Sequence, residues 1–133
     1  MFFDDIIFTD NYEVKRNNNT FGVTEGFMLG NMFKDEYDAY KNYKVQRLNA
    51  TNEKGALLLM IYEFDFAIND LSLKLDLNPN DKELYELFRK FTMEEKRLVT
   101  MYENKYGPLE LCESDYENYE WYKGKWPFEG GNI

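Results

Sequence analysis

Two runs of apolar residues at helical spacing, separated by a short polar turn, limit the possible folds of this 133-residue chain more than any other feature. In each run, large apolar side chains recur every three or four residues, which places them on one face of an α-helix. The first run consists of Leu57, Ile61, Phe64, Ile68, Leu71 and Leu75. The second consists of Leu84, Leu87, Phe88, Phe91, Leu98, Met101 and Tyr102. The pattern therefore predicts an all-α fold with two long helices.

Proline and glycine mark the ends of both helices. Asn78 precedes Pro79, and a residue before proline avoids the helical conformation, so we expect the first helix to end near residue 77. We expect Pro79 in the first turn of the second helix, with Asn78 as its N-cap. The dipeptide Gly107-Pro108 is typical of a helix end. Because the connecting turn is short, the two helices should be antiparallel neighbours.

Differences in residue composition divide the chain into three parts. Residues 1–48 contain scattered glycine, asparagine and aromatic residues, which argue against a long regular element. Residues 49–108 form the predicted hairpin, and residues 109–133 form an acidic and aromatic tail. We therefore predict a long antiparallel helical hairpin with irregular aromatic arms at its N- and C-terminal sides.

The first helix has a second apolar stripe, formed by Leu59, Phe66 and Leu73, that one partner helix cannot cover. Each large apolar side chain left in water forgoes roughly 1.5–3 kcal/mol, so either the chain's own arms or another protein should cover this stripe. Aromatic side chains, which are frequent at interface hot spots, fill the tail, although the tail could instead fold back over the hairpin. The predicted partner-binding residues are Leu59, Phe66, Leu73, Trp121, Tyr122, Trp126 and Phe128.

Charge and composition exclude several classes of function. The chain has 25 acidic against 16 basic residues and a formal net charge of −9, which disfavours binding to nucleic acid or to an anionic membrane. It has no histidine, so Ser–His and Cys–His nucleophile pairs and imidazole metal sites are absent. Its one cysteine, Cys112, can form neither an internal disulfide nor a structural zinc site. We expect a protein that is not an enzyme and that binds no cofactor or metal ion.

Several short motifs recur together in the hairpin and tail. They are Asp65-Phe66-Ala67, Leu71, Leu73, Leu75-Asp76, Asn78-Pro79-Asn80-Asp81, Tyr102, Tyr106-Gly107-Pro108-Leu109 and Trp126-Pro127-Phe128-Glu129. In combination, over about residues 65–129, they resemble the spore coat protein family CotJB. A weaker resemblance, over about residues 25–43, is to the companion family CotJA, and it lies in Glu25-Gly26-Phe27, Gly30-Asn31-Met32-Phe33 and Tyr37-Asp38-Ala39-Tyr40.

The resemblance implies a small, non-enzymatic assembly protein of the endospore coat. Such a protein would be synthesised in the cytoplasm of the mother cell and then built into the coat. Its implied partners are other coat proteins, in particular CotJC, a protein similar to manganese catalases. These properties follow from the resemblance alone.

Two other classes of function are open at this point. The segment Leu75-Asp76-Leu77-Asn78-Pro79-Asn80-Asp81 is also similar to a tetratricopeptide junction, which suggests a generic peptide-binding helical module. Repeat proteins need about three stacked units with a 34-residue period, whereas the sequence has one hairpin. An enzyme is the third possibility, and the missing histidine argues against it.

Overall fold

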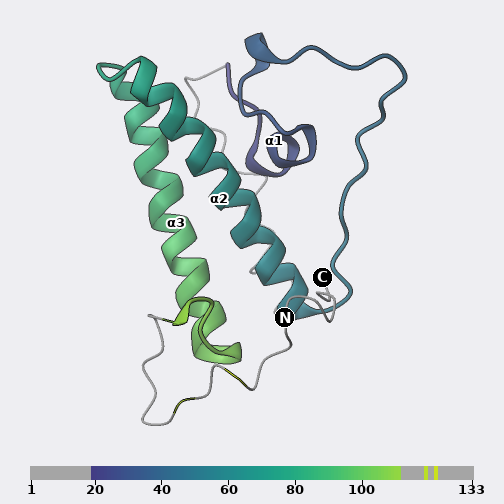
Figure 1. The fold of residues 1–133 in the computed structure, drawn as a ribbon, viewed down its shortest axis with the longest axis vertical. Coiled ribbons are helices and arrows are strands. Elements are labelled where there is room, and N and C mark those ends of the chain that lie inside the picture. Colours follow the sequence, from purple (N-terminus) through teal and green to yellow (C-terminus); the bar gives the residue numbers. More distant parts are fainter. Residues whose placement is uncertain (1–18, 112–118, 120–121, 123–133) are drawn as a thin grey trace.

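A computed structural model describes residues 19–111, 119 and 122 of the chain (Figure 1). The described part is helical, apart from one isolated antiparallel bridge between Thr20 and Phe33. Its elements are α1 (Val23–Leu29), the short 3₁₀ helix η2 (Lys34–Glu36), α2 (Glu53–Leu77) and α3 (Lys82–Tyr106). The predicted all-α class is confirmed.

Helices α2 and α3 run side by side in opposite directions, as the sequence predicted (Figure 1). Their facing apolar stripes form the centre of the core, where the rings of Phe64 and Phe91 meet edge to face with centroids 5.5 Å apart. At the open end of the hairpin, Lys105 near the end of α3 forms a 2.5 Å ion pair with Glu53 at the start of α2. The hairpin is thus held by apolar packing along its length and by a polar contact at its base.

The turn between the helices differs in one respect from the sequence prediction. Asp81, not Asn78, is the N-cap of α3, because its carboxylate accepts a 3.0 Å hydrogen bond from the backbone N–H of Leu84. Asn78 instead ends α2, where its own backbone N–H donates to the carbonyl oxygens of Lys74 and Leu75. Pro79 therefore lies in the turn and not in the first turn of α3. At the start of α2, the side chain of Asn52 is the N-cap.

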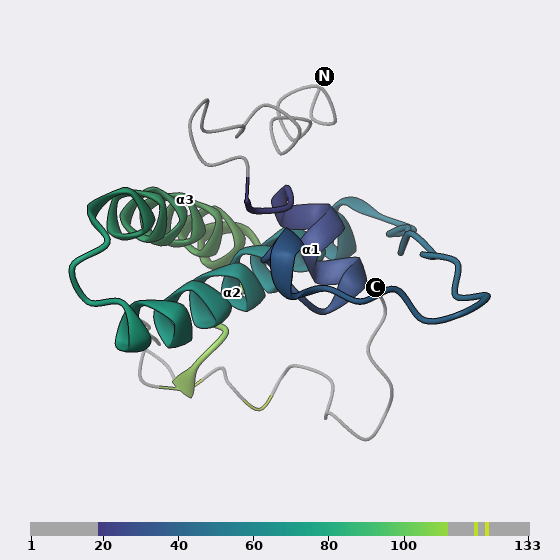
Figure 2. The same cartoon turned by 90° about the horizontal axis from the view of Figure 1, so that it is seen from above.

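The N-terminal arm contains short helical elements that the sequence did not predict. Helix α1 has seven residues and ends at Gly30, whose φ of 72° is the left-handed conformation that glycine adopts without strain. The chain then returns past the start of α1, where Phe21 N–H donates to the Met32 carbonyl at 2.8 Å. Figure 1 and Figure 2 both show α2 lying between α3 and the arm.

The arm contributes to the same core as the hairpin. Val23, Met32 and Phe33 are buried in one cluster with the inward-facing residues of α2 and α3. This explains why α2 is apolar around most of its circumference, since it is covered by α3 on one side and by the arm on another. None of the helices in the described part of the chain is long and apolar enough to cross a membrane.

Candidate partner-binding surface

Helix α1 of the arm docks on the flank of α2 through one aromatic contact and one hydrogen bond to a buried carboxylate. The rings of Phe27 and Phe66 meet edge to face with centroids 5.9 Å apart. The hydroxyl of Thr24 donates a 2.9 Å hydrogen bond to the carboxylate of Glu63. Glu63 is only 4% exposed, and a buried carboxylate requires such a donor. The interaction fixes α1 against the middle of α2.

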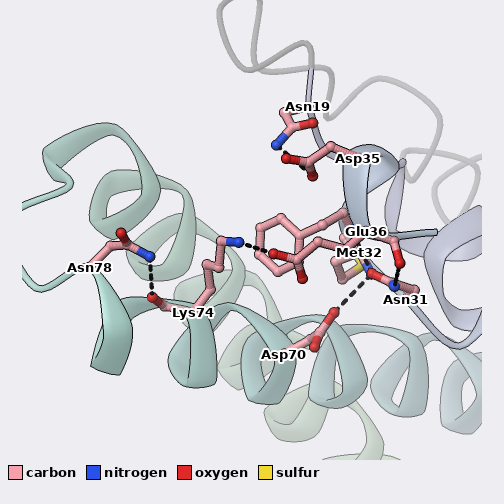
Figure 3. Close-up of polar contacts among 9 residues, drawn as sticks. Asn19, Asn31, Met32, Asp35, Glu36, Asp70, Lys74 and Asn78 are labelled. Atoms are coloured by element: carbon pink, nitrogen blue, oxygen red, sulfur yellow. Dashed lines mark hydrogen bonds and ion pairs between the residues drawn. The ribbon is translucent and has the colours of Figure 1, made fainter.

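A second group of polar contacts holds the end of the arm (Figure 3). The backbone N–H of Met32 donates to Oδ2 of Asp70 at 2.8 Å. One turn further along α2, Lys74 forms an ion pair with Glu36, and its ammonium group also lies 5.1 Å from the centre of the Phe33 ring. The hydrogen bond to Glu36 raises the pKa of Lys74 above its usual value. The arm therefore covers α2 from about residue 63 to residue 74.

The structure places the predicted stripe residues in three different environments. Leu59 is buried, and Phe66 is half-buried beside Phe27. Leu73, in contrast, is 57% exposed. Of the stripe, only Leu73 presents an accessible apolar surface, and the chain's own arm covers Phe66.

The tail residues of the prediction lie mostly outside the described part of the chain. Tyr122 is described, and 59% of its surface is exposed. Its ring stacks on that of Tyr119, with centroids 6.0 Å apart. Trp121, Trp126 and Phe128 lie outside the described residues.

The sequence analysis missed one residue that extends the accessible surface. Leu77, the last residue of α2, is 80% exposed and lies one helical turn beyond Leu73. The signal was its spacing of four residues from Leu73, which places both side chains on the same face. Asp70 and Asp76, three residues on either side of Leu73, give this apolar end of α2 an acidic border. We call Leu73, Leu77, Asp70 and Asp76 the α2 end face.

Another face of the hairpin brings carboxylates of α2, of α3 and of the segment after α3 near one another. Partial burial raises the pKa of Asp65, which stays exposed on α2, and the negative charge of Glu110 raises it further. Burial also raises the pKa of Glu95 on α3, with the charges of Asp65 and Glu110 adding to the effect and that of Lys96 opposing it. Within the described residues, no group of three acidic or cysteine side chains is arranged to hold a metal ion.

These features define a class of protein: an all-α protein built on a long helical hairpin, completed by its own N-terminal arm and with an apolar helix end left accessible. The chain belongs to the CotJB protein family, whose family model matches residues 55–129. The match covers more than half of the chain and begins in the first turn of α2, about ten residues before the motifs that carry the resemblance. CotJB proteins are spore coat proteins, and this membership assigns the chain to the spore coat.

The remaining comparisons add no relatives. No curated protein and no solved structure matches the chain. The family match does not include residues 25–43, so the resemblance of the arm to CotJA is not supported.

Proposed function

We propose that this protein is a non-enzymatic assembly factor that helps to incorporate a manganese-catalase-like protein, similar to CotJC, into the endospore coat. The observation that carries the proposal is the accessible apolar end of α2, where Leu73 and Leu77 are exposed, whereas most other apolar residues of the helix are covered. Membership in a spore coat family supplies the setting for a protein–protein contact. Synthesis in the cytoplasm of the mother cell, before coat assembly, belongs to the same proposal.

The described aromatic residues of the tail support a role in binding. Tyr122 is accessible in the structure, and tyrosine and tryptophan offer a large contact area at a low cost in conformational entropy. We assign the partner-binding surface to Leu73 together with the tail residues Trp121, Tyr122, Trp126 and Phe128. Leu59 and Phe66 would act indirectly, because they form the support on which the arm and the end of α2 are held.

Affinity purification from sporulating cells of the source tests the proposal. The tagged protein should recover a manganese-catalase-like protein in near-stoichiometric amount, as identified by mass spectrometry. The variant Leu73→Asp should reduce this recovery at least tenfold. The matched control is Met93→Asp, which places the same charge on an exposed apolar position of α3 and should leave recovery unchanged. Absence of a catalase-like companion, with expression confined to growing cells, would contradict the proposal.

A generic tetratricopeptide-like module is the second candidate. The described residues contain one long hairpin, and no second helical pair of the same kind stacks on it. The same purification separates the two functions, because a generic module would recover unrelated peptides or proteins and not one coat component.

A further inference from the structure

The segment Tyr40–Leu48 has an unusual combination of exposure, charge and apolar character. Every residue from 38 to 49 is exposed, and Figure 1 and Figure 2 show this part of the chain as a long loop outside the helices. One hydrogen bond, from the Tyr43 hydroxyl to the Met28 carbonyl of α1 at 3.4 Å, ties the loop to the helices. Its large apolar side chains are all exposed, with Tyr40 the most exposed of them at 80%. They are Tyr40, Tyr43, Val45 and Leu48. We call residues 40–48 the strap.

The strap is also cationic in a strongly acidic chain. Lys41, Lys44 and Arg47 alternate with its apolar residues, and it contains no carboxylate. The rest of the chain has 13 of the 16 basic residues and all 25 acidic ones. Such a segment is complementary to a surface that combines exposed apolar side chains with carboxylates.

The α2 end face is a surface of that kind. Leu73 and Leu77 are exposed one turn apart, and Asp70 and Asp76 border them. The neighbouring cation, Lys74, is paired with Glu36 and is also attracted by Asp70, whose Oδ2 accepts from Met32 N–H. Asp76, which is exposed, is therefore the carboxylate of this face that is most open to a partner. The face has the two features that the strap would require of a partner.

Chain length keeps the C-terminal half of the strap away from the end face of its own molecule. The N-terminal half begins four residues after Glu36, the partner of Lys74, but in the structure Tyr40 is 80% exposed and the Tyr43 hydroxyl donates to the Met28 carbonyl of α1. The strap leads into the start of α2, whereas Leu73 lies 20 residues further along, or about 30 Å at 1.5 Å per residue. Leu48 is five residues before Glu53, which allows at most about 18 Å of extended chain. Arg47 and Leu48 therefore cannot reach Leu73 and Leu77 within one chain. A second copy has no such restriction.

We propose that the strap of one molecule binds the α2 end face of a second copy. The inference rests on the proposed function and adds to it. The strap of a second copy and the catalase-like protein would compete for the Leu73 end of the binding surface, whereas the aromatic tail would bind the catalase-like protein alone. The contact joins two different surfaces of the same chain. A head-to-tail contact of this type leaves one strap and one end face available in every dimer, so it propagates into larger assemblies, which are open-ended unless successive copies close a ring. Propagation of this kind suits a protein that forms part of a coat.

A second copy fits the strap better than nucleic acid or an anionic membrane. The net charge of −9 repels both polyanions, and neither supplies apolar side chains bordered by single carboxylates. Two copies also repel each other at long range, but the Debye length of about 8 Å at physiological salt confines this repulsion to short distances. At short range, the complementarity between the strap and the end face then determines whether two copies bind. Association should accordingly be weak and should weaken further as salt increases.

Sedimentation velocity of the purified full-length protein under reducing conditions tests the inference. The wild-type chain should form dimers and larger species as its concentration rises from micromolar to millimolar, and about 0.5 M salt should weaken this association at least tenfold. The triple variant Lys41→Glu, Lys44→Glu and Arg47→Glu should remain monomeric. The control Lys82→Glu, Arg89→Glu and Lys90→Glu makes the same change of charge at exposed positions of α3 and should associate like the wild type.

Mixing two disabled variants distinguishes this contact from any other. The variant Leu73→Asp with Leu77→Asp should also be monomeric on its own. A mixture of this variant with the strap variant should form dimers and nothing larger, because only one functional strap and one functional end face meet. Circular dichroism confirms that both variants retain the helical content of the wild type.

Three results would overturn the inference. They are a wild-type chain that stays monomeric up to about 1 mM, a strap variant that associates like the wild type, and a mixture that forms no dimer. If the strap binds double-stranded DNA or phosphatidylglycerol vesicles while the chain stays monomeric, its partner is a polyanion and the inference is wrong. The catalase-recovery experiment is independent of these measurements, because the purified chain is tested alone.

Discussion

The backbone N–H of Met32 donates a 2.8 Å hydrogen bond to Oδ2 of Asp70, which joins the arm to α2 across 38 positions in the sequence. The Met32 side chain is fully buried, so the arm must stay docked for this residue to remain out of water. The hydrogen bond and the apolar contact therefore support each other. Loss of either should loosen the arm without changing the pairing of α2 with α3.

Substitution of Asp70 by alanine tests this relationship. The Met32 N–H would lose its acceptor in a part-buried site, and leaving such a donor unsatisfied costs about 1–3 kcal/mol. Urea unfolding should show a loss of this size, together with faster proteolysis of the arm at Lys34. Asp76→Ala is the matched control, because Asp76 is exposed on the same helix, and it should change stability by less than about 0.5 kcal/mol. Equal effects of the two substitutions would contradict the role of Asp70.

Close packing between α1 and the residues after it gives a second prediction. A Cβ atom at Gly26 would lie 2.3 Å from the sulfur of Met32 and 3.3 Å from the Asn31 carbonyl oxygen. Because Met32 is enclosed by the core, Gly26→Ala should destabilise the protein by about 1–3 kcal/mol, as measured by thermal or urea unfolding. Gly22→Ala introduces the same methyl group where no atom lies within 4 Å, and it should have an effect smaller than about 0.5 kcal/mol. A Gly26→Ala variant as stable as the wild type would show that the site accommodates a Cβ atom without strain.

The start of α3 gives a third prediction. Asp81→Ala removes the side chain that accepts from Leu84 N–H, and the loss of such an N-cap costs about 1 kcal/mol. Asn78→Ala removes a weaker contact, a 3.2 Å hydrogen bond from the side-chain amide to the Lys74 carbonyl, and should cost less. Urea unfolding of the two variants shows which of them loses more folding stability. A larger loss for Asn78→Ala would restore Asn78 as the N-cap that the sequence analysis predicted.

The hairpin could be predicted because its determinants are local. Apolar residues at three- and four-residue spacing define the facing stripes of α2 and α3, and a proline between the stripes marks the turn. The N-cap was misassigned because Pro79 was taken as a first-turn residue, whereas the carboxylate of Asp81 caps α3 two residues later. Proline is compatible with both the turn and the first turn of a helix, so the sequence does not decide between them.

The docked arm could not be predicted because its determinants are distant in the sequence. Helix α1 has seven residues and no sustained apolar period, and its position depends on contacts with Glu63 and Phe66 about 39 residues away. The second stripe on α2 correctly indicated that something beyond α3 must cover this helix. Which residues of the stripe are covered depends on where the arm ends, and only the structure gives this. Leu73 is accessible because the arm contacts α2 along the row of Phe66, Asp70 and Lys74, which does not include it, and Leu77 is accessible because it lies beyond Lys74.

The carboxylates Asp65 and Glu95 make stability depend on pH. Burial, followed by the charges of nearby acidic groups, raises the pKa of Asp65 from its ordinary value of 3.8 and that of Glu95 from 4.5. An acid with a raised pKa binds its proton more tightly in the folded state than in the unfolded state. The stability that these two groups contribute is therefore greatest below their ordinary pKa values and falls as the pH rises through the raised values.

Replacement of both carboxylates by amides should remove the loss of folding stability that occurs as the pH rises. At pH 7 the double variant Asp65→Asn, Glu95→Gln should be more stable than the wild type. The gain should be less than about 1 kcal/mol, because solvent screens both groups. At pH 3 the double variant and the wild type should differ little in stability. Melting temperatures measured from pH 3 to pH 7 give the comparison. Asp76→Asn with Glu86→Gln removes the same charge from exposed positions and serves as the control for the net charge of the chain. If the control gains as much stability at pH 7 as the Asp65 and Glu95 variant, the effect comes from overall charge and not from these two carboxylates. A variant that is less stable than the wild type at pH 7 would show that the two carboxylates form favourable contacts that outweigh their burial and mutual repulsion.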